Sequence, residues 1–227
     1  METNEVLLPG GYKLFEQEGV KMVGNTKEEF AVKNRSFLEV DTYFSQEISK
    51  TINELLNKRP VGQIQVLDLA GGTESQAVKD IEIEKEFGNR VLALNIDFSQ
   101  NIEKGKGALR VQGDATQIPL ADSSIDIVYS RQFLPFIMRF NPKHNLQIKK
   151  VITEVARVLK PGGIAFLDDE EELSGAKSDN KRQQLANEFG VILETRESLR
   201  LVKGNRNFPK FWGRSMRPEK FLVMRKL

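Results

Sequence analysis

Residues 66–74, which read Val-Leu-Asp-Leu-Ala-Gly-Gly-Thr-Glu, contain the pattern that decides the fold. A short apolar run with an acid near its end is followed by the glycine pair Gly71 and Gly72 and by residues that favour a helix start. The pattern predicts a strand, a turn and a helix, because glycines permit positive φ and helix N-terminal amides face the same crevice. Thr73 and Gln76 are spaced for a capping box. The turn therefore either binds a ligand against bare backbone or is simply a tight turn.

Two further apolar runs along the chain also end in acids. Asp97 lies 25 residues after Gly72, and Asp114 closes the next run in Gly113-Asp114-Ala115. The carboxyl ends of parallel strands meet at one edge of a sheet, which is where open α/β sheets bind ligands. A carboxylate at the spacing of Asp97 suits a ribose diol. The sequence therefore predicts a ligand crevice bordered by three carboxylates.

The remaining pattern predicts an α/β fold, a Rossmann-like three-layer sandwich whose seven-stranded sheet is mostly parallel with an antiparallel last strand. Apolar residues between Ile148 and Leu159 repeat with helical spacing, and Lys160-Pro161-Gly162-Gly163 stops that helix. Residues 1–60 are expected to form a small N-terminal helical cap and a lead-in helix, and residues 61–227 the main domain. The expected strands are Ile64–Leu69, Arg90–Asp97, Ala108–Asp114, Ile125–Ser130, Gly163–Asp168, Val191–Arg196 and Lys220–Arg225.

In their order, these motifs resemble the class I S-adenosylmethionine-dependent methyltransferases of the small-molecule type, which include the ubiquinone and menaquinone methyltransferases. The resembling segments, from Val66 to Phe166, are residues 67–73, 94–97, 113–128 and 154–163. The resemblance implies that residues 61–227 form a methyltransferase domain with S-adenosylmethionine as cofactor. The cofactor-binding residues that it implies are Asp68, Ala70, Gly71, Gly72, Asp97, Phe98, Asp114, Ala115 and Ser130.

One departure from the family lies in the glycine turn. The family usually has glycine at the positions of Ala70 and Glu74. Alanine adds a methyl group and is strained at positive φ, and Glu74 adds negative charge and bulk near the donor. We expect S-adenosylmethionine binding that is retained but weakened, and the alternative is a non-catalytic relative. A nicotinamide dehydrogenase ranks last because the turn lacks G-x-G-x-x-G.

The acceptor side has weaker signals. Arg131, directly after the fourth strand, and Tyr12, as part of an N-terminal lid, are the candidates for a catalytic role. Arg131 could hold an anionic acceptor or brace a loop, and Tyr12 could equally face the core. His144 could act as a base or simply face solvent. Residues 168–172, five consecutive acids, suit either a metal or a solvated loop, and we predict no metal.

Composition and charge limit the other functions. The chain has no cysteine, which excludes thiolate nucleophiles and disulfides, and it has no apolar run long enough to span a membrane. No secretory signal is evident, so we expect a cytoplasmic protein. From Arg200 to the end there are nine Lys or Arg and one acid, with Phe208, Phe211 and Trp212 between them. The first hypothesis is a methyltransferase for a small-molecule acceptor, and the second is an RNA or ribosomal methyltransferase that uses this basic end.

Overall fold

A computed structural model describes the sheet, its covering helices and part of the N-terminal region. The residues described are 6–8, 12–17, 20–25, 35–72, 75–83, 87–97, 109–131, 133–135, 144–169, 179–198 and 220–227. Within them, no helix is both long enough and apolar enough to cross a membrane.

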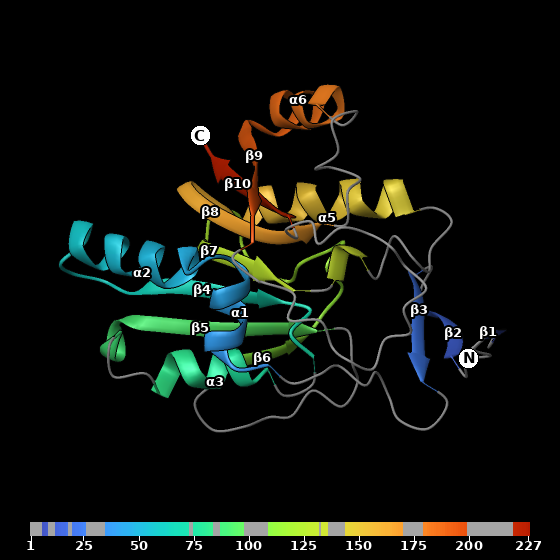
Figure 1. The fold of residues 1–227 in the computed structure, drawn as a ribbon, viewed down its shortest axis with the longest axis horizontal. Helices are drawn as coiled ribbons and strands as arrows, with labels where there is room; N and C mark the ends of the chain where they lie inside the picture. Colours follow the sequence, from blue (N-terminus) through green and yellow to red (C-terminus); the bar gives the residue numbers. More distant parts are fainter. Residues whose placement is uncertain are drawn as a thin grey trace, which may run out of the picture.

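A seven-stranded sheet in the order β6-β5-β4-β7-β8-β10-β9 forms the centre of the molecule. In Figure 1 the arrows of β4, β5, β7 and β8 point the same way, and β10 points the opposite way. The strands of this sheet are β4 (Ile64–Leu69), β5 (Val91–Asp97), β6 (Leu109–Gln112), β7 (Ile125–Ser130), β8 (Leu159–Asp169), β9 (Val191–Glu197) and β10 (Lys220–Lys226).

Strand β10 pairs antiparallel with both β8 and β9, whereas β4 to β8 pair parallel with one another. The predicted fold class, a mostly parallel seven-stranded sheet with an antiparallel last strand, is therefore confirmed. The last strand lies between β8 and β9 in the sheet. This places β9 at the edge.

The largest difference from the expected boundaries is at the start of β8. This strand begins at Leu159, which pairs with Ile125, and the pairing resumes only at Ile164 with Ile127. The intervening Pro-Gly-Gly segment forms an irregularity in the ladder rather than a loop outside it. A Cβ on Gly163 would lie 2.8 Å from the Lys160 carbonyl oxygen, so this close approach requires glycine.

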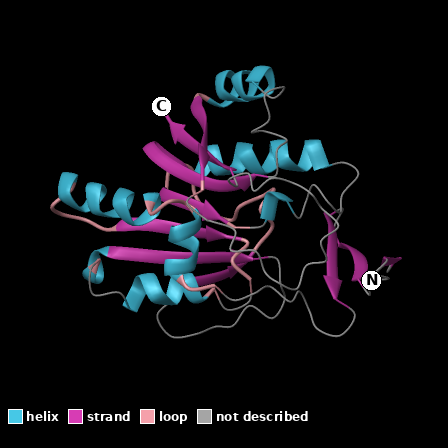
Figure 2. Ribbon diagram, in the orientation of Figure 1, coloured by secondary structure: helices cyan, strands magenta, loops and turns pink. Residues whose placement is uncertain are grey.

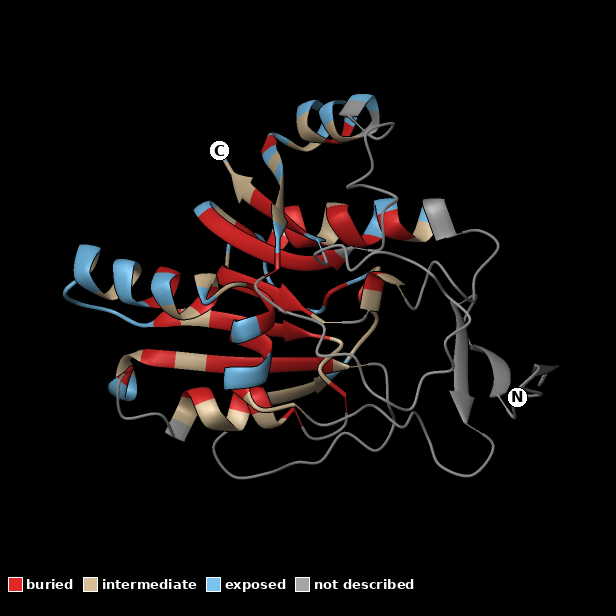
Figure 3. Ribbon diagram, in the orientation of Figure 1, coloured by how far each residue is buried: buried red, intermediate tan, exposed pale blue. Residues whose placement is uncertain are grey.

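Helices cover both faces of the sheet, so the three-layer arrangement is also confirmed. Alternate strand residues point to opposite faces, which is why Val66 belongs to one apolar core and Leu67 to the other. Figure 2 shows strands in the middle and helices around them, and Figure 3 shows that the central strands are almost wholly buried. One face packs on α1 (Phe37–Tyr43), α2 (Glu47–Lys58) and α3 (Gln76–Ile83), and the other on α5 (His144–Val158) and α6 (Asp179–Phe189); a short 3₁₀ turn, η1 (Gly88–Arg90), precedes β5.

The N-terminal region contains strands as well as helices. Strands β1 (Val6–Leu8), β2 (Tyr12–Gln17) and β3 (Val20–Asn25) form a separate antiparallel sheet, where the sequence favoured a partly helical cap. Helix α1 begins at a capping box formed by Ser36 and Glu39. The division of the chain at residue 60 and the covering of the acceptor side by the N-terminal region stay predictions.

Candidate functional site

The backbone of the glycine turn after β4 takes left-handed conformations that its sequence only partly favours. Ala70 has φ 63° and Gly72 has φ 81°. The Ala70 N–H donates to the Ile96 carbonyl oxygen at 2.7 Å, which extends the ladder between β4 and β5. A Cβ on Gly71 would lie 2.2 Å from Oδ2 of Asp68 and 2.7 Å from Oδ1 of Asn95. Glycine is therefore required at position 71, and the predicted strain at Ala70 is present.

Strand β5 fixes this turn through two side chains. Oδ2 of Asp97 accepts a hydrogen bond from the Gly72 N–H at 2.8 Å, and Nδ2 of Asn95 donates to the Gly72 carbonyl oxygen at 2.7 Å. Asn95 is fully buried, and its Oδ1 makes no hydrogen bond to any described residue. The Asp97 carboxylate, which the sequence predicts to border the ligand crevice, thus contacts the turn directly and holds Gly72 at the carboxyl edge of the sheet.

Asp68 lies directly beneath the turn in a polar cluster. Its Oδ2 accepts a hydrogen bond from Oγ of Ser75 at 2.6 Å. Burial, followed by the negative charge of Asp97, raises the pKa of Asp68 to about 7, while Ser75, Tyr129 and Arg35 act in the opposite direction. Burial and the nearby Asp68 carboxylate raise the pKa of Tyr129 well above its usual value. At neutral pH the site can therefore either hold or release a proton at Asp68.

The helix that follows the turn begins later than the sequence predicts. Helix α3 starts at Gln76, and Oγ of Ser75 accepts the Val78 N–H at 3.2 Å. Ser75 is therefore the N-cap, and the capping box expected from Thr73 and Gln76 is wrong because Gln76 is the first helical residue. Ser75 also donates to Asp68, so one hydroxyl joins the helix start to the strand end.

The end of β6 has its own turn at the same edge. Oδ1 of Asp114 accepts the Thr116 N–H at 2.7 Å, and the Asp114 carbonyl oxygen accepts the Gln117 N–H at 2.9 Å. Ala115 is buried. Arg157 of α5 holds the loop that follows, donating to the carbonyl oxygens of Ile118 and Leu120. The Asp114 carboxylate shapes this turn, and the predicted border with adenine stays a prediction.

Beyond β7 the site contains a second charged group. Nη1 of Arg131 lies 2.8 Å from Oδ2 of Asp168, which is the penultimate residue of β8 and is fully buried. The Arg131 guanidinium carbon also lies 3.5 Å from the centre of the Tyr43 ring of α1. Ser130 is fully buried, and its Oγ makes no hydrogen bond to a described residue. The order of the strands therefore places the glycine turn between Asp97 on one side and Ser130 with Arg131 on the other.

Several predicted residues lie outside the described part of the chain. Phe98, Glu74 and the side chains of Tyr12 and His144 are among them; Tyr12 belongs to β2 and His144 begins α5. The acids at 170–172 and the basic residues at 199–217 are also outside it. Among the residues that are described, no three His, Cys, Asp or Glu side chains are grouped to hold a metal.

Sequence reasoning missed Ser75, Asn95 and Tyr43. The signal for Asn95 was a single amide within an apolar strand, and the signal for Ser75 was a hydroxyl one residue before the helix. Tyr43 lies 88 residues before Arg131 in the chain, and no local pattern connects them. Contacts of this kind appear only when the chain is folded.

Comparisons with known proteins agree with this arrangement. A family model described as a methyltransferase domain matches residues 67–167, from β4 to β8. The ubiquinone/menaquinone biosynthesis C-methyltransferase UbiE of Haemophilus ducreyi is 35% identical over 109 residues, covering 44% of this chain and 38% of that protein. The demethylmenaquinone methyltransferase of Corynebacterium glutamicum is 36% identical over 102 residues, with the same coverage. The match thus spans about two-fifths of the length of these curated relatives.

The fold also resembles that of solved methyltransferases. The crystal structure of the CurJ carbon methyltransferase superposes with a TM-score of 0.50 and 14% identity, covering 78% of this chain and 52% of that chain. At this identity the likeness is one of fold. Together with the family match, it confirms the resemblance to class I methyltransferases that the sequence motifs indicate.

Proposed function

We propose that this chain, whose residues 67–167 carry a methyltransferase domain, binds S-adenosylmethionine at the carboxyl edge of its sheet and transfers the methyl group to a small-molecule acceptor. The observation that carries the proposal is the Gly72–Asp97 hydrogen bond of 2.8 Å, which sets a bare glycine turn beside a strand-end carboxylate. The family match over 67–167 supports it.

The residues present suit this cofactor. Gly71 leaves no room for a side chain above Asp68 and Asn95, so its backbone is bare at the turn. S-adenosylmethionine carries a sulfonium and an ammonium, and Asp68 and Asp97 place two carboxyl groups at the turn. We assign Asp97 to the ribose hydroxyls and residues 70–72 to the methionine end, with Asp114 and Ala115 near the adenine.

Methyl transfer asks little acid–base work of the protein. When bound, S-adenosylmethionine supplies an activated methyl group: the C–S electron pair stays on sulfur as the acceptor's nucleophilic atom forms the new bond to carbon. The protein aligns the reactants and excludes water. Ser130, which is fully buried, and Arg131, whose side chain is 10% exposed, give a largely dry wall next to the glycine turn.

Titration calorimetry with S-adenosylmethionine and S-adenosylhomocysteine tests the proposal. We expect both to bind the wild-type protein, and we expect Asp97→Ala to abolish binding because it removes the carboxylate that holds Gly72. Glu188→Gln is the matched control, since Glu188 is 40% exposed on α6 and pairs with Lys149. Absence of binding to the wild type would overturn the proposal and favour a non-catalytic relative.

A second candidate function is methylation of RNA. Strand β9 ends and β10 begins at the same edge as the glycine turn, because Glu197 pairs with Lys220 and Lys220 with Asp169. Residues 199–219 between them contain six Lys or Arg and one acid. This hypothesis predicts RNA affinity that falls steeply with salt and on neutralising Lys210, Arg214 and Arg217. RNA affinity that changes neither with salt nor with these substitutions would reject the hypothesis.

A cytoplasmic location of the protein stays an expectation.

A further inference from the structure

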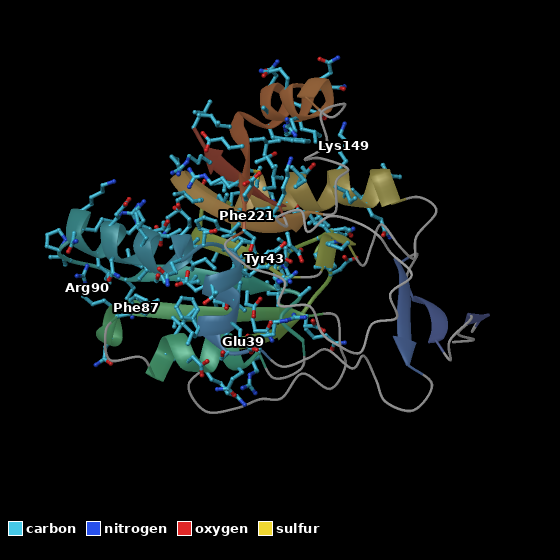
Figure 4. All side chains as sticks on the ribbon, in the orientation of Figure 1. Glu39, Tyr43, Phe87, Arg90, Lys149 and Phe221 are labelled. Carbon is cyan, nitrogen blue, oxygen red and sulfur yellow. The ribbon has the colours of Figure 1, made fainter. Side chains whose placement is uncertain are left out.

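Arg131 is fixed in place by two other elements of the fold, β8 and α1. Its guanidinium pairs with Asp168 of β8 at 2.8 Å and lies over the ring of Tyr43 in α1 at 3.5 Å. Tyr43 is itself anchored by two hydrogen bonds. Its hydroxyl donates to the Lys220 carbonyl oxygen at 3.3 Å, and its carbonyl oxygen accepts a hydrogen bond from the Ser198 hydroxyl at 2.6 Å. Figure 4 shows Tyr43 close to Phe221 of β10, and their ring centres are 6.4 Å apart. The side-chain entropy of Arg131 is therefore lost when the protein folds and not when a ligand binds.

The position of Arg131 differs from that of a surface brace. It follows β7 directly, one residue after Ser130, whose buried hydroxyl makes no hydrogen bond to a described residue. β7 adjoins β4, so Arg131 lies on the side of the glycine turn away from Asp97. A planar guanidinium with fixed orientation recognises an oxyanion at low entropic cost, by two parallel hydrogen bonds.

A second guanidinium lies near the first. Burial, followed by the positive charge of Arg131, lowers the pKa of Arg35, while Asp168, Asp68 and Glu39 act in the opposite direction. Asp168 therefore acts as a counter-charge to both arginines.

We propose that the methyl acceptor is an anion whose carboxylate or phosphate is bound by Arg131, with Asp168 and Tyr43 as positioning residues. This inference rests on the proposed function, because it names the acceptor class of the same site. Malonate and inorganic phosphate serve as probes of the two kinds of oxyanion.

The experiment follows these probes by ligand-observed NMR, with dimethyl malonate as the uncharged control, at constant ionic strength and with and without S-adenosylhomocysteine. We expect malonate or phosphate to bind and dimethyl malonate not to bind. The probe that binds identifies the oxyanion. Arg131→Met should abolish this binding, and Arg131→Lys should weaken it about tenfold, because lysine keeps the charge and loses the planar fork.

Two further variants separate recognition from general structure. Asp168→Asn should weaken anion binding while S-adenosylhomocysteine affinity stays within about twofold, which a merely structural role would not produce. Arg196→Gln is the control arginine, because Arg196 of the edge strand β9 pairs with Glu47 of α2 and with Glu194. It should change neither affinity. Circular dichroism confirms that each variant is folded.

The outcomes distinguish this inference from the proposed function. If S-adenosylhomocysteine binds and neither anion binds better than dimethyl malonate, or Arg131→Met leaves anion binding intact, the acceptor inference is overturned. If S-adenosylhomocysteine does not bind, the methyltransferase proposal falls. In that case, malonate or phosphate binding to the cofactor-free wild type, and its loss in Arg131→Met, still decides whether the anion site exists.

Discussion

At Ala70 a single methyl group lies where the turn takes a left-handed conformation. The φ of 63° costs an L-residue about 1–2 kcal/mol, whereas glycine adopts it freely but loses about 0.5–1 kcal/mol of chain entropy on folding. Ala70→Gly should therefore stabilise the protein by about 0.5–1 kcal/mol, measured by urea unfolding. It should also raise S-adenosylhomocysteine affinity several-fold, because backbone replaces a methyl group at the ligand edge.

Ser123→Gly provides the matched control for this change. Ser123 also has a left-handed φ, 52°, but it precedes β7 at the opposite edge of the sheet. We expect a similar gain in stability with no change in S-adenosylhomocysteine affinity. Equal effects of the two substitutions on affinity would show that the Ala70 methyl does not restrict the cofactor.

Asp68 gives the site a pH dependence opposite in sign to that of most carboxylates. Burial raises its pKa to about 7, against about 3.9 in an unfolded chain. The folded state therefore holds the proton more tightly, and this group's contribution to stability is lost as pH rises from about 4 to about 7. Asp97 adds to the shift, and Tyr129 and Arg35 oppose it.

Substitution by asparagine isolates this effect. Relative to the wild type, Asp68→Asn should gain at least about 1 kcal/mol of unfolding free energy between pH 5 and pH 8, since one pKa unit corresponds to about 1.4 kcal/mol. Urea unfolding of both proteins at each pH measures the difference. A difference that stays constant with pH would contradict the assignment.

The elements of the sheet are joined at the opposite, amino edge by a buried carboxylate. Asp126 near the start of β7 is 1% exposed and pairs with Arg59, which follows α2, and with Nζ of Lys160 at 2.7 Å. Its Oδ2 also accepts the Gln65 N–H of β4 at 2.8 Å. One side chain therefore links the ends of four elements.

Loss of this charge should be costly. Asp126→Asn leaves two cations with a neutral partner. Because Arg59 and Lys160 are 39% and 27% exposed, we expect a loss of about 1.5–3 kcal/mol, the range for a hydrogen bond to a charged group. Asp122→Asn is the control, because Asp122 pairs with Arg157 but is 77% exposed, and exposed pairs contribute about 0–1 kcal/mol. Urea unfolding measures both. Similar losses of unfolding free energy in the two variants would show that the ion pairs of Asp126 contribute no more stability than one exposed ion pair.

At the scale of the whole molecule, α1 and α2 are part of the same core as the sheet. Phe44, which is fully buried just after α1, lies 6.0 Å from Phe166 of β8 and 5.2 Å from Phe221 of β10 between ring centres. Ile48 and Ile52 of α2 are fully buried in the same cluster. Residues 37–58 therefore share an apolar core with the sheet.

Substitution of Phe44 tests this shared core. Phe44→Ala should lower the free energy of unfolding of the whole protein by about 3–5 kcal/mol in one transition. Leu38→Ala, on the 70% exposed side chain of the same helix, should change it by less than about 0.5 kcal/mol. Circular dichroism in urea follows both. A separate early transition in Phe44→Ala would indicate that the helices unfold independently.

The sequence by itself determined where the sheet strands lie along the chain, because hydrophobic periodicity and glycine punctuation are local properties. The expected strand 125–130 agrees with β7, and the glycine turn follows the expected strand 64–69. The start of β8 was missed because pairing with Ile125 overrides a Pro-Gly-Gly signal. Residues 12–17, which the sequence placed in a partly helical region, form a strand.

Only the tertiary structure decided how the charged groups of the site are arranged. Arg131 was found from its place after a strand, but its partners Asp168 and Tyr43 come from elements 37 and 88 residues away in the chain. Likewise, the proton affinity of Asp68 depends on burial and on Asp97, which no local pattern specifies. Periodicity records which face of an element is apolar, whereas electrostatic partners depend on which elements meet, and that is set by packing over the whole chain.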